Sequence, residues 1–285
     1  MFTTLISVAQ LQSLMANGQA VMVFDCSFDL MQATAGDTQY AQGHVAGAVR
    51  ADLERHLSAK GAPDAASGGR HPLPSREKFA AWLGSVGLTN NMQVVVYDRQ
   101  GVNYCGRLWW MLKWAGHEAV AVLDGGWQAW QAAGGAVELG AGTPRTAENF
   151  VLTEPQTRLI ATETLVQQLG RPSQTIVDAR AAARFRGEVE PLDPVAGHIP
   201  GALNRAYAQN LDGNGFFKPA DQLKAEFAEL LAGHDPASVV HHCGSGVSAV
   251  PNVIGMELAG LGRAGLYAGS WSEWCSDPAR PVAQG

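Results

Sequence analysis

The sequence predicts an α/β protein built from two tandem copies of one domain, each a parallel sheet flanked by helices on both faces. Short apolar runs alternate with helical patterns along the chain, and motifs of the first half recur in the same order in the second. A stretch rich in Gly, Thr and Pro, without hydrophobic period, separates the two halves. We therefore expect a first domain over 1–138, a linker over 139–155 and a second domain over 156–285.

Caps and apolar runs predict the elements of the first copy. Ser7 precedes a helical pattern that runs through Ala16 and is ended by Gly18. The apolar run 21–24 stops at Asp25, as expected of a buried parallel strand. The elements that follow are a helix over 76–86, a strand over 93–97, a helix opened by the loop 98–102 and running through Ala115, and a strand over 119–123.

The second copy repeats this order at nearly constant spacing. The matching stretches are 176–178 with 24–25, 197–202 with 43–48, 243–247 with 98–102, and 269–274 with 125–130. The copies differ at one position that matters for chemistry, because Asp98 stands where the second copy has Cys243. We therefore expect the second domain to carry a nucleophile and the first to be non-catalytic.

The stretch from Val239 to Ala249 predicts a catalytic loop. An apolar run ends at Cys243, and Gly244 and Gly246 let the backbone curl so that successive N–H groups point inward. A helix after the loop adds the positive end of its dipole, which favours the reactive thiolate. The alternative is a buried structural cysteine. Cys26, Cys105 and Cys275 lack a comparable loop and are expected to be structural.

Composition excludes several classes of protein. The chain has 285 residues, 46% hydrophobic content and a net charge of -6, with no basic cluster that would bind nucleic acid. No apolar run is long enough to cross a bilayer and no secretory signal opens the chain, so we expect a cytoplasmic protein without membrane contact. His241 and His242 point to opposite faces of a strand, so we expect no metal, and nothing indicates a cofactor.

The duplicated motifs and the single cysteine loop resemble the tandem-domain rhodanese sulfurtransferases over essentially the whole chain. The loop Cys-Gly-Ser-Gly-Val-Ser is similar to that of the 3-mercaptopyruvate sulfurtransferases within that family. Thiosulfate sulfurtransferases typically carry Arg and Lys where this chain has Gly244 and Ser245. The resemblance implies sulfur transfer from 3-mercaptopyruvate through a Cys243 persulfide with release of pyruvate, and thiosulfate sulfurtransferase is the alternative.

The resemblance also implies roles for individual residues. They are Cys243 as nucleophile, Ser245, Asp52 and His71 in proton transfer, Arg184 for the substrate carboxylate, and the loop residues Gly244, Gly246, Val247 and Ser248 in substrate binding. Without the resemblance, three of these residues have a simpler structural interpretation. His71 in a Pro-rich loop suits a solvated side chain, Asp52 suits a helix cap, and Arg184 suits a surface ion pair.

Two further expectations concern substrates. The family pattern has a second arginine after Glu190-Pro191, whereas this chain has Leu192, so either Arg180 or Arg186 substitutes or the carboxylate is held less firmly. The acceptor is expected to be thioredoxin, another small thiol or cyanide.

Two other classes of protein fit the sequence less well. A cysteine phosphatase would need Arg as the sixth residue after the cysteine, and this chain has Ala249 there. A non-catalytic binding module would be expected to lose Cys243.

Overall fold

The computed structural model describes residues 1–285 and forms two compact units. Unit 1 contains residues 1–59, 74–156 and 213–217, and unit 2 contains residues 60–73, 157–212 and 218–285. The stretch 60–73 therefore packs with the second unit, although its position in the sequence lies within the first copy. It contains no helix or strand, so no place in a sheet ties it to the first copy. The stretch 139–155, expected to be a linker, belongs to unit 1.

Unit 1 contains a parallel sheet of five strands in the order β1-β6-β5-β2-β4. These strands are β1 (Leu5–Ile6), β2 (Val21–Asp25), β4 (Val49–Arg50), β5 (Gln93–Tyr97) and β6 (Val120–Leu123), and β3 (His44–Val45) pairs antiparallel with β7 (Val137–Glu138). The helices are α1 (Val8–Ala16), α2 (Ala35–Gln42), α3 (Arg76–Ser85), α4 (Cys105–Trp114) and α5 (Gly126–Ala132). The Ser7 side chain caps α1 as predicted, in a capping box with Gln10.

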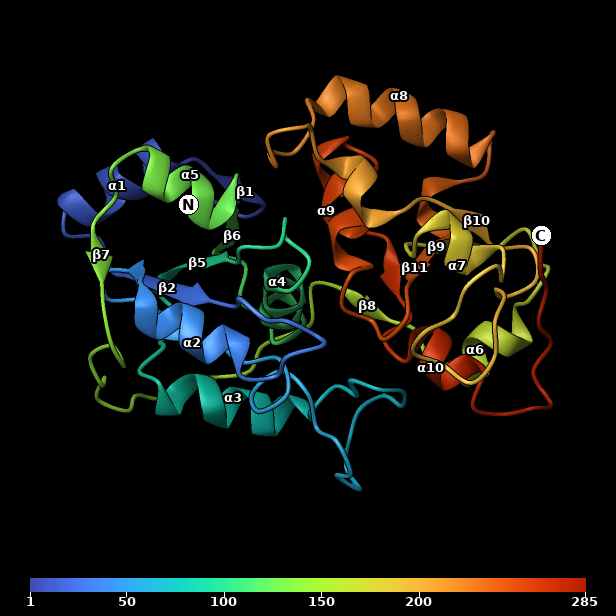
Figure 1. Ribbon diagram of the computed structural model, residues 1–285, viewed down its shortest axis with the longest axis horizontal. Helices are drawn as coiled ribbons and strands as arrows, with labels where there is room; N and C mark the ends of the chain where they lie inside the picture. Colours follow the sequence, from blue (N-terminus) through green and yellow to red (C-terminus); the bar gives the residue numbers. More distant parts are fainter. The chain divides into compact units, whose positions relative to one another are not determined.

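Helices cover both faces of the unit 1 sheet (Figure 1). Val23 of β2 packs in one cluster with Leu11 of α1 and Trp127 of α5. The next residue, Phe24, points the other way and contacts Trp82 of α3. The predicted two-sided α/β layering is therefore confirmed in this unit.

Unit 2 repeats the architecture with a parallel sheet in the order β8-β12-β11-β9-β10. Its strands are β8 (Arg158–Leu159), β9 (Thr175–Asp178), β10 (Leu203–Asn204), β11 (Val239–His242) and β12 (Gly265–Leu266). Its helices are α6 (Thr162–Gln167), α7 (Ala182–Phe185), α8 (Ala220–Leu231), α9 (Val250–Leu258) and α10 (Ser270–Trp274), with 3-10 turns η1 (Tyr207–Asn210) and η2 (Pro236–Ser238). Val240 of β11 packs with Leu165 and Trp271 on one face, and His241 meets Met256 of α9 on the other.

The two sheets have the same strand order when matching strands are compared, β5 occupying in unit 1 the place that β11 occupies in unit 2. The central strand of each sheet leads directly into the loop where the copies differ. None of the helices is long and apolar enough to span a bilayer.

Candidate active site

Cys243 follows the last residue of β11, at the carboxyl end of a central strand of unit 2. Its side chain is 1% exposed. The backbone on either side is fixed: the Cys243 carbonyl accepts a hydrogen bond from the N–H of Trp271 at 2.9 Å, and the Gly244 carbonyl accepts one from Ser272 at 2.9 Å. The amino-terminal turn of α10 therefore holds the start of the loop.

Ser270 adds a side-chain contact to this support. Its hydroxyl accepts the N–H of Cys243 at 3.1 Å and donates to the carbonyl of Tyr267 at 2.9 Å. Ser270 has φ 56°, the left-handed region, where the first copy has Gly126, also with φ 56°. A serine in that conformation carries backbone strain, and strain of this kind concentrates at functional sites.

Gly246 is required by the path of the loop. Its φ is 73°, and a Cβ at this position would lie 2.0 Å from the carbonyl oxygen of Ala268. Gly101 of unit 1, at the matching position, has φ 66°. Both copies therefore place a left-handed glycine at the same point of the loop, although in unit 1 the next residue, Val102, is left-handed as well, with φ 65°.

The unit 1 loop shows what this turn does with an anion. The carboxylate of Asp98 accepts four backbone hydrogen bonds at 2.8–3.0 Å, and the donors are the N–H groups of Gln100, Val102, Tyr104 and Cys105. The loop is thus an anion-binding nest filled by its own side chain. In unit 2 the N–H of Val250, which matches that of Cys105, donates to the Val247 carbonyl at 3.2 Å.

Ser245 and His71 meet within unit 2. The His71 Nδ1 atom lies 2.8 Å from the Ser245 hydroxyl, and both residues are buried, at 2% and 7% exposure. The stretch 60–73 brings His71 there, anchored by a hydrogen bond from the N–H of Gly68 to Glu273. His71 is therefore a buried side chain and not a solvated one.

Asp52 lies in unit 1 and is 3% exposed. Its Oδ1 atom accepts the backbone N–H groups of Glu54 and Arg55, and its Oδ2 atom pairs with Arg50 at 3.1 Å. The carboxylate thus caps the turn that follows it, which was the plainer reading of this residue. Its role in proton transfer stays a prediction.

Arg184 extends from α7 toward the Cys243 loop. Its Nε and Nη2 atoms bind Glu190 at 3.2 and 2.6 Å, and Nη2 also lies 3.2 Å from Asp193. A Cβ placed on Gly244 would lie 3.4 Å from Arg184 Nη1. Two carboxylates thus hold one side of the guanidinium while its other end reaches the residue after Cys243.

Comparison with known proteins agrees with this geometry. The rhodanese-like domain model matches residues 7–133 and 161–277. The chain belongs to the rhodanese-like family. It is 46% identical to a probable 3-mercaptopyruvate sulfurtransferase of Pseudomonas aeruginosa over 269 residues, covering 93% of each chain. It is 41% identical over 285 residues to a Mycobacterium tuberculosis protein provisionally named thiosulfate sulfurtransferase SseB, covering 99% of this chain and 97% of that one.

Solved structures give the same family. The 3-mercaptopyruvate sulfurtransferase of Leishmania major superposes with a TM-score of 0.81 at 32% identity, covering 96% of this chain and 74% of that one. The Escherichia coli protein SseA, described as a 3-mercaptopyruvate sulfotransferase, gives 0.79 at 28% identity, covering 95% and 100%. The expected rhodanese fold in two copies is confirmed.

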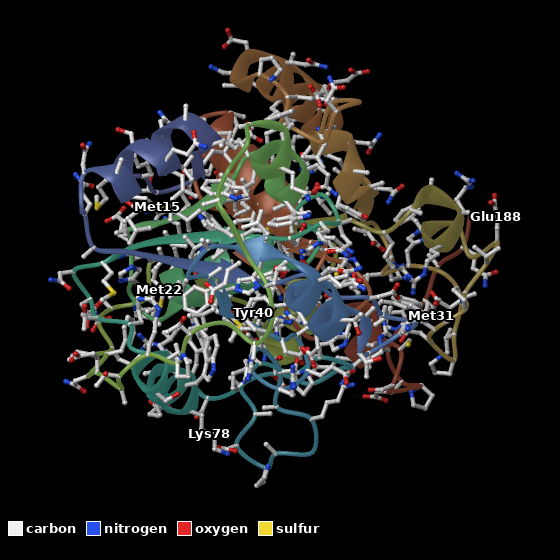
Figure 2. All side chains as sticks on the ribbon, turned by 60° about the vertical axis from the view of Figure 1, so that its left-hand side comes forward. Met15, Met22, Met31, Tyr40, Lys78 and Glu188 are labelled. Atoms are coloured by element: carbon white, nitrogen blue, oxygen red, sulfur yellow. The ribbon has the colours of Figure 1, made fainter.

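Two of the arginines considered in this rhodanese-like protein lie elsewhere. Arg180 is buried, with its guanidinium bound to Asp178 and stacked 4.7 Å from the ring of Trp271. Arg186 pairs with Glu188, which lies at the periphery of the protein (Figure 2). Neither reaches the Cys243 loop through a contact, so neither replaces the arginine expected at Leu192.

Arg70 is the residue that the sequence reasoning missed. A Cβ on Gly244 would lie 3.1 Å from Arg70 Nη2, nearer than from either nitrogen of Arg184. Arg70 immediately precedes His71, which is a predicted site residue, and this neighbouring position was the one signal in the sequence that could have indicated Arg70. In the sequence the stretch 60–73 lies within the first copy, so the sequence does not predict that Arg70 lies beside Gly244 of the second.

The other cysteines of this rhodanese-like protein are poorly suited to nucleophilic chemistry. Burial raises the pKa of Cys26, Cys105 and Cys275, and neighbouring carboxylates raise it further. Their thiolates are therefore disfavoured near neutral pH.

Proposed function

We propose that this protein is a sulfurtransferase that moves sulfur from 3-mercaptopyruvate to a thiol or cyanide through a persulfide on Cys243. The observation that carries the proposal is the paired loop. In unit 1 the loop after the central strand gathers four N–H groups on the Asp98 carboxylate, and in unit 2 the matching loop, with a left-handed glycine at the matching position, follows Cys243. A persulfide anion on Cys243 is the species that such a nest would stabilise.

The first half-reaction follows from this placement. The Cys243 thiolate attacks the sulfur of mercaptopyruvate, a sulfur–sulfur bond forms, and the carbon–sulfur bond breaks with its electron pair going to the enolate of pyruvate. The proton carried by the donor thiol ends on the enolate carbon, so the products are a Cys243 persulfide anion and pyruvate. An acceptor thiolate or cyanide then attacks the outer sulfur and restores the Cys243 thiolate.

Ser245 and His71 are suited to move the proton. A hydroxyl hydrogen-bonded to an imidazole can pass a proton and receive another without leaving its place. The 2.8 Å contact supports this pair as the relay. Asp52 is proposed as a third member on the family resemblance alone.

Arg184 is proposed to bind the donor carboxylate, since a guanidinium offers parallel N–H donors to a carboxylate. Its Nη1 end lies beside Gly244, one residue from the nucleophile. Gly244, Gly246, Val247 and Ser248 are proposed to contact the substrate through their backbone. The first domain, where Asp98 fills the loop, is proposed to have no sulfur-carrying role.

Thiosulfate is the second candidate donor, and relatives carry both names. Gly244 and Ser245 remove the loop charges typical of thiosulfate enzymes, which favours mercaptopyruvate. The test is steady-state kinetics with both donors side by side. We expect a higher kcat/KM for mercaptopyruvate, and faster turnover of thiosulfate would move the assignment to the alternative. Thioredoxin as acceptor and the cytoplasmic location stay predictions from the sequence.

A further inference from the structure

Residues 282–285, here called the strap, close the base of a loop that runs from Gly187 to Gly197. The two ends of this loop meet, because a Cβ on Gly187 would lie 3.2 Å from the backbone nitrogen of Gly197. Both glycines have positive φ, 78° and 126°. Gln284 of the strap lies against both, since its Cγ atom would be 3.0 Å from a Cβ on Gly187 and 3.2 Å from a Cβ on Gly197.

Backbone hydrogen bonds join the strap to both sides of this base. The N–H of His198 donates to the Ala283 carbonyl at 2.8 Å, and the N–H of Ala283 donates to the His198 carbonyl at 2.9 Å. On the other side, the N–H of Gly285 donates to the Arg186 carbonyl at 3.1 Å. A Cβ on Gly197 would lie 2.3 Å from the Ala283 carbonyl oxygen, so a side chain there would displace the strap.

The loop carries both carboxylates that hold Arg184. Glu190 accepts Arg184 Nε at 3.2 Å and Nη2 at 2.6 Å, and Asp193 lies 3.2 Å from Nη2. The Glu190 and Asp193 side chains are almost fully buried, so salt screens these contacts little. Glu190 Oε1 also accepts the N–H groups of Leu192 and Asp193, which fixes the turn inside the loop. The position of the Arg184 guanidinium therefore depends on the position of this loop.

The first copy has the same pairing without the loop. His44 lies on β3, which pairs antiparallel with β7, and His198 pairs in the same sense with the strap. In each copy the histidine Nδ1 atom lies 2.8 Å from the carbonyl oxygen of an aromatic residue on which its ring stacks, Tyr40 in the first and Phe185 in the second. Four positions separate the first pair and thirteen the second. The additional residues are the loop that holds Arg184, in the copy that carries the nucleophile.

We propose that the strap is a positioning element for the sulfur donor: by closing the base of the 187–197 loop, it fixes the two carboxylates that hold Arg184. This inference rests on the proposed function for the role of Arg184. The hydrogen bonds of the strap go to the base of the loop and not to Cys243. Loosening the strap should therefore weaken binding of the donor and leave the reactivity of the thiol unchanged.

The competing explanation is that the strap only completes the fold of unit 2. Both explanations predict lower stability when the strap is loosened. They differ in where the loss appears: in the 187–197 loop and in the KM for the donor, or evenly across unit 2 and in kcat as well. The test therefore needs a readout of local opening and a separation of KM from kcat.

Ala283→Pro is the main variant, because proline has no N–H and deletes the bond to the His198 carbonyl. Ala283→Ser keeps the N–H and is the control at the same position. Hydrogen exchange followed by mass spectrometry reports local opening. We expect amides of the 187–197 loop to exchange about tenfold faster in Ala283→Pro, the effect of about one hydrogen bond, and those of β11 to be unchanged. Ala283→Ser should exchange as the wild type does.

Kinetics with mercaptopyruvate complete the test. We expect Ala283→Pro to raise KM about tenfold with a smaller change in kcat, while neutral iodoacetamide alkylates Cys243 at the wild-type rate. The rate of anionic iodoacetate relative to iodoacetamide should fall about tenfold, because Arg184 is displaced. Faster exchange in the loop with unchanged KM would overturn the proposal, and so would unchanged exchange or exchange raised equally in β11.

Two further outcomes are decided separately. Wild-type protein that does not turn over mercaptopyruvate would defeat the proposed function; the alkylation ratio then decides on the strap, a fall in Ala283→Pro supporting its effect on Arg184 and an unchanged ratio overturning it. Should Ala283→Pro fail to fold, Gln284→Ala replaces it, because it deletes the bond from the Gln284 amide to the Ala196 carbonyl at 3.1 Å. Its matched control is Gln222→Ala, which removes an exposed amide bonded at 3.0 Å within α8. Faster loop exchange and a raised KM are expected in Gln284→Ala alone, and wild-type values of either would overturn the proposal.

Discussion

The imidazole of His71 and the hydroxyl of Ser245 lie 2.8 Å apart, although 174 positions separate them in the sequence. The contact joins a Pro-rich loop to the residue two after the nucleophile. Under the proposed function this contact is the route by which a proton reaches the loop, because the Cys243 side chain is only 1% exposed.

Ser245→Ala should therefore slow the release of pyruvate more than the formation of the thiolate. We expect a loss in kcat of about a hundredfold or more, the usual size of a proton-transfer contribution. His71→Asn should have a similar effect, and the double variant should be little worse than either single one, because the two residues act as a unit. Losses that multiply would show that they act separately. The measurement is kcat for pyruvate release from about pH 6 to about pH 9, a range that includes the ordinary pKa of histidine.

Ser270 should matter through its hydroxyl and not through its conformation. Ser270→Gly relieves the backbone strain at φ 56° but deletes the hydrogen bond to the Cys243 N–H. We expect lower turnover and slightly lowered thermal stability, because the hydroxyl's bond to the Tyr267 carbonyl is lost as well, and two bonds of about 1 kcal/mol each outweigh about 1 kcal/mol of strain. A Ser270→Gly protein with full activity would mean that the carbonyl contacts of α10 alone hold the loop.

Asp98 should stabilise unit 1 by filling its loop. Asp98→Ala leaves four inward N–H groups without their acceptor, and we expect unfolding to become easier by about 3 kcal/mol or more. Asp221→Ala, at an exposed position of α8, should change stability little. The readout is the urea midpoint of each protein. Persulfide formation on Cys243 should survive in Asp98→Ala protein that remains folded, since that loop belongs to unit 2.

His241 should make the fold sensitive to acid. Burial lowers the pKa of His241 to about 3, from 6.5, and its Nε2 faces the sulfur of Met256 at 3.1 Å. Below pH 6.5 the unfolded chain binds a proton that the folded chain refuses, so stability falls as pH drops toward 3, by up to about 1.4 kcal/mol per pH unit. His241→Phe should flatten this decline, and His234→Gln on the surface should not. Equal slopes in urea titrations at several pH values would contradict this.

The sequence was sufficient to predict the two-domain α/β architecture, because the patterns that indicate it are either local or repeated in both copies. The structure contains three features that the sequence predicts: the cap at Ser7, the central strands at the apolar runs, and the matching places of Asp98 and Cys243 in the two copies. Duplication helped, since an element recognised in one copy identified its counterpart in the other. The two sheets have the same strand order, as expected of two copies of one domain.

The site was predicted less completely, for reasons of packing. Nothing local in the 60–73 stretch indicates that it packs with unit 2, because it lacks any periodic pattern. Arg70 was missed for that reason, and Arg180 was considered although it is committed to Asp178. The strain at Ser270 is likewise a property of the folded backbone. The alignment of the two copies, which matches Ser270 with Gly126, could have indicated it.

The measurement that tests the central claim most directly is the intact mass of the protein after incubation with mercaptopyruvate and no acceptor. We expect the gain of one sulfur atom, localised by peptide mapping to Cys243, together with one equivalent of pyruvate. Loss of the added mass on treatment with a thiol, and its absence in Cys243→Ser, complete the expected result. Sulfur that stays on the Cys243→Ser protein, or that maps to Cys26, Cys105 or Cys275, would contradict the assignment.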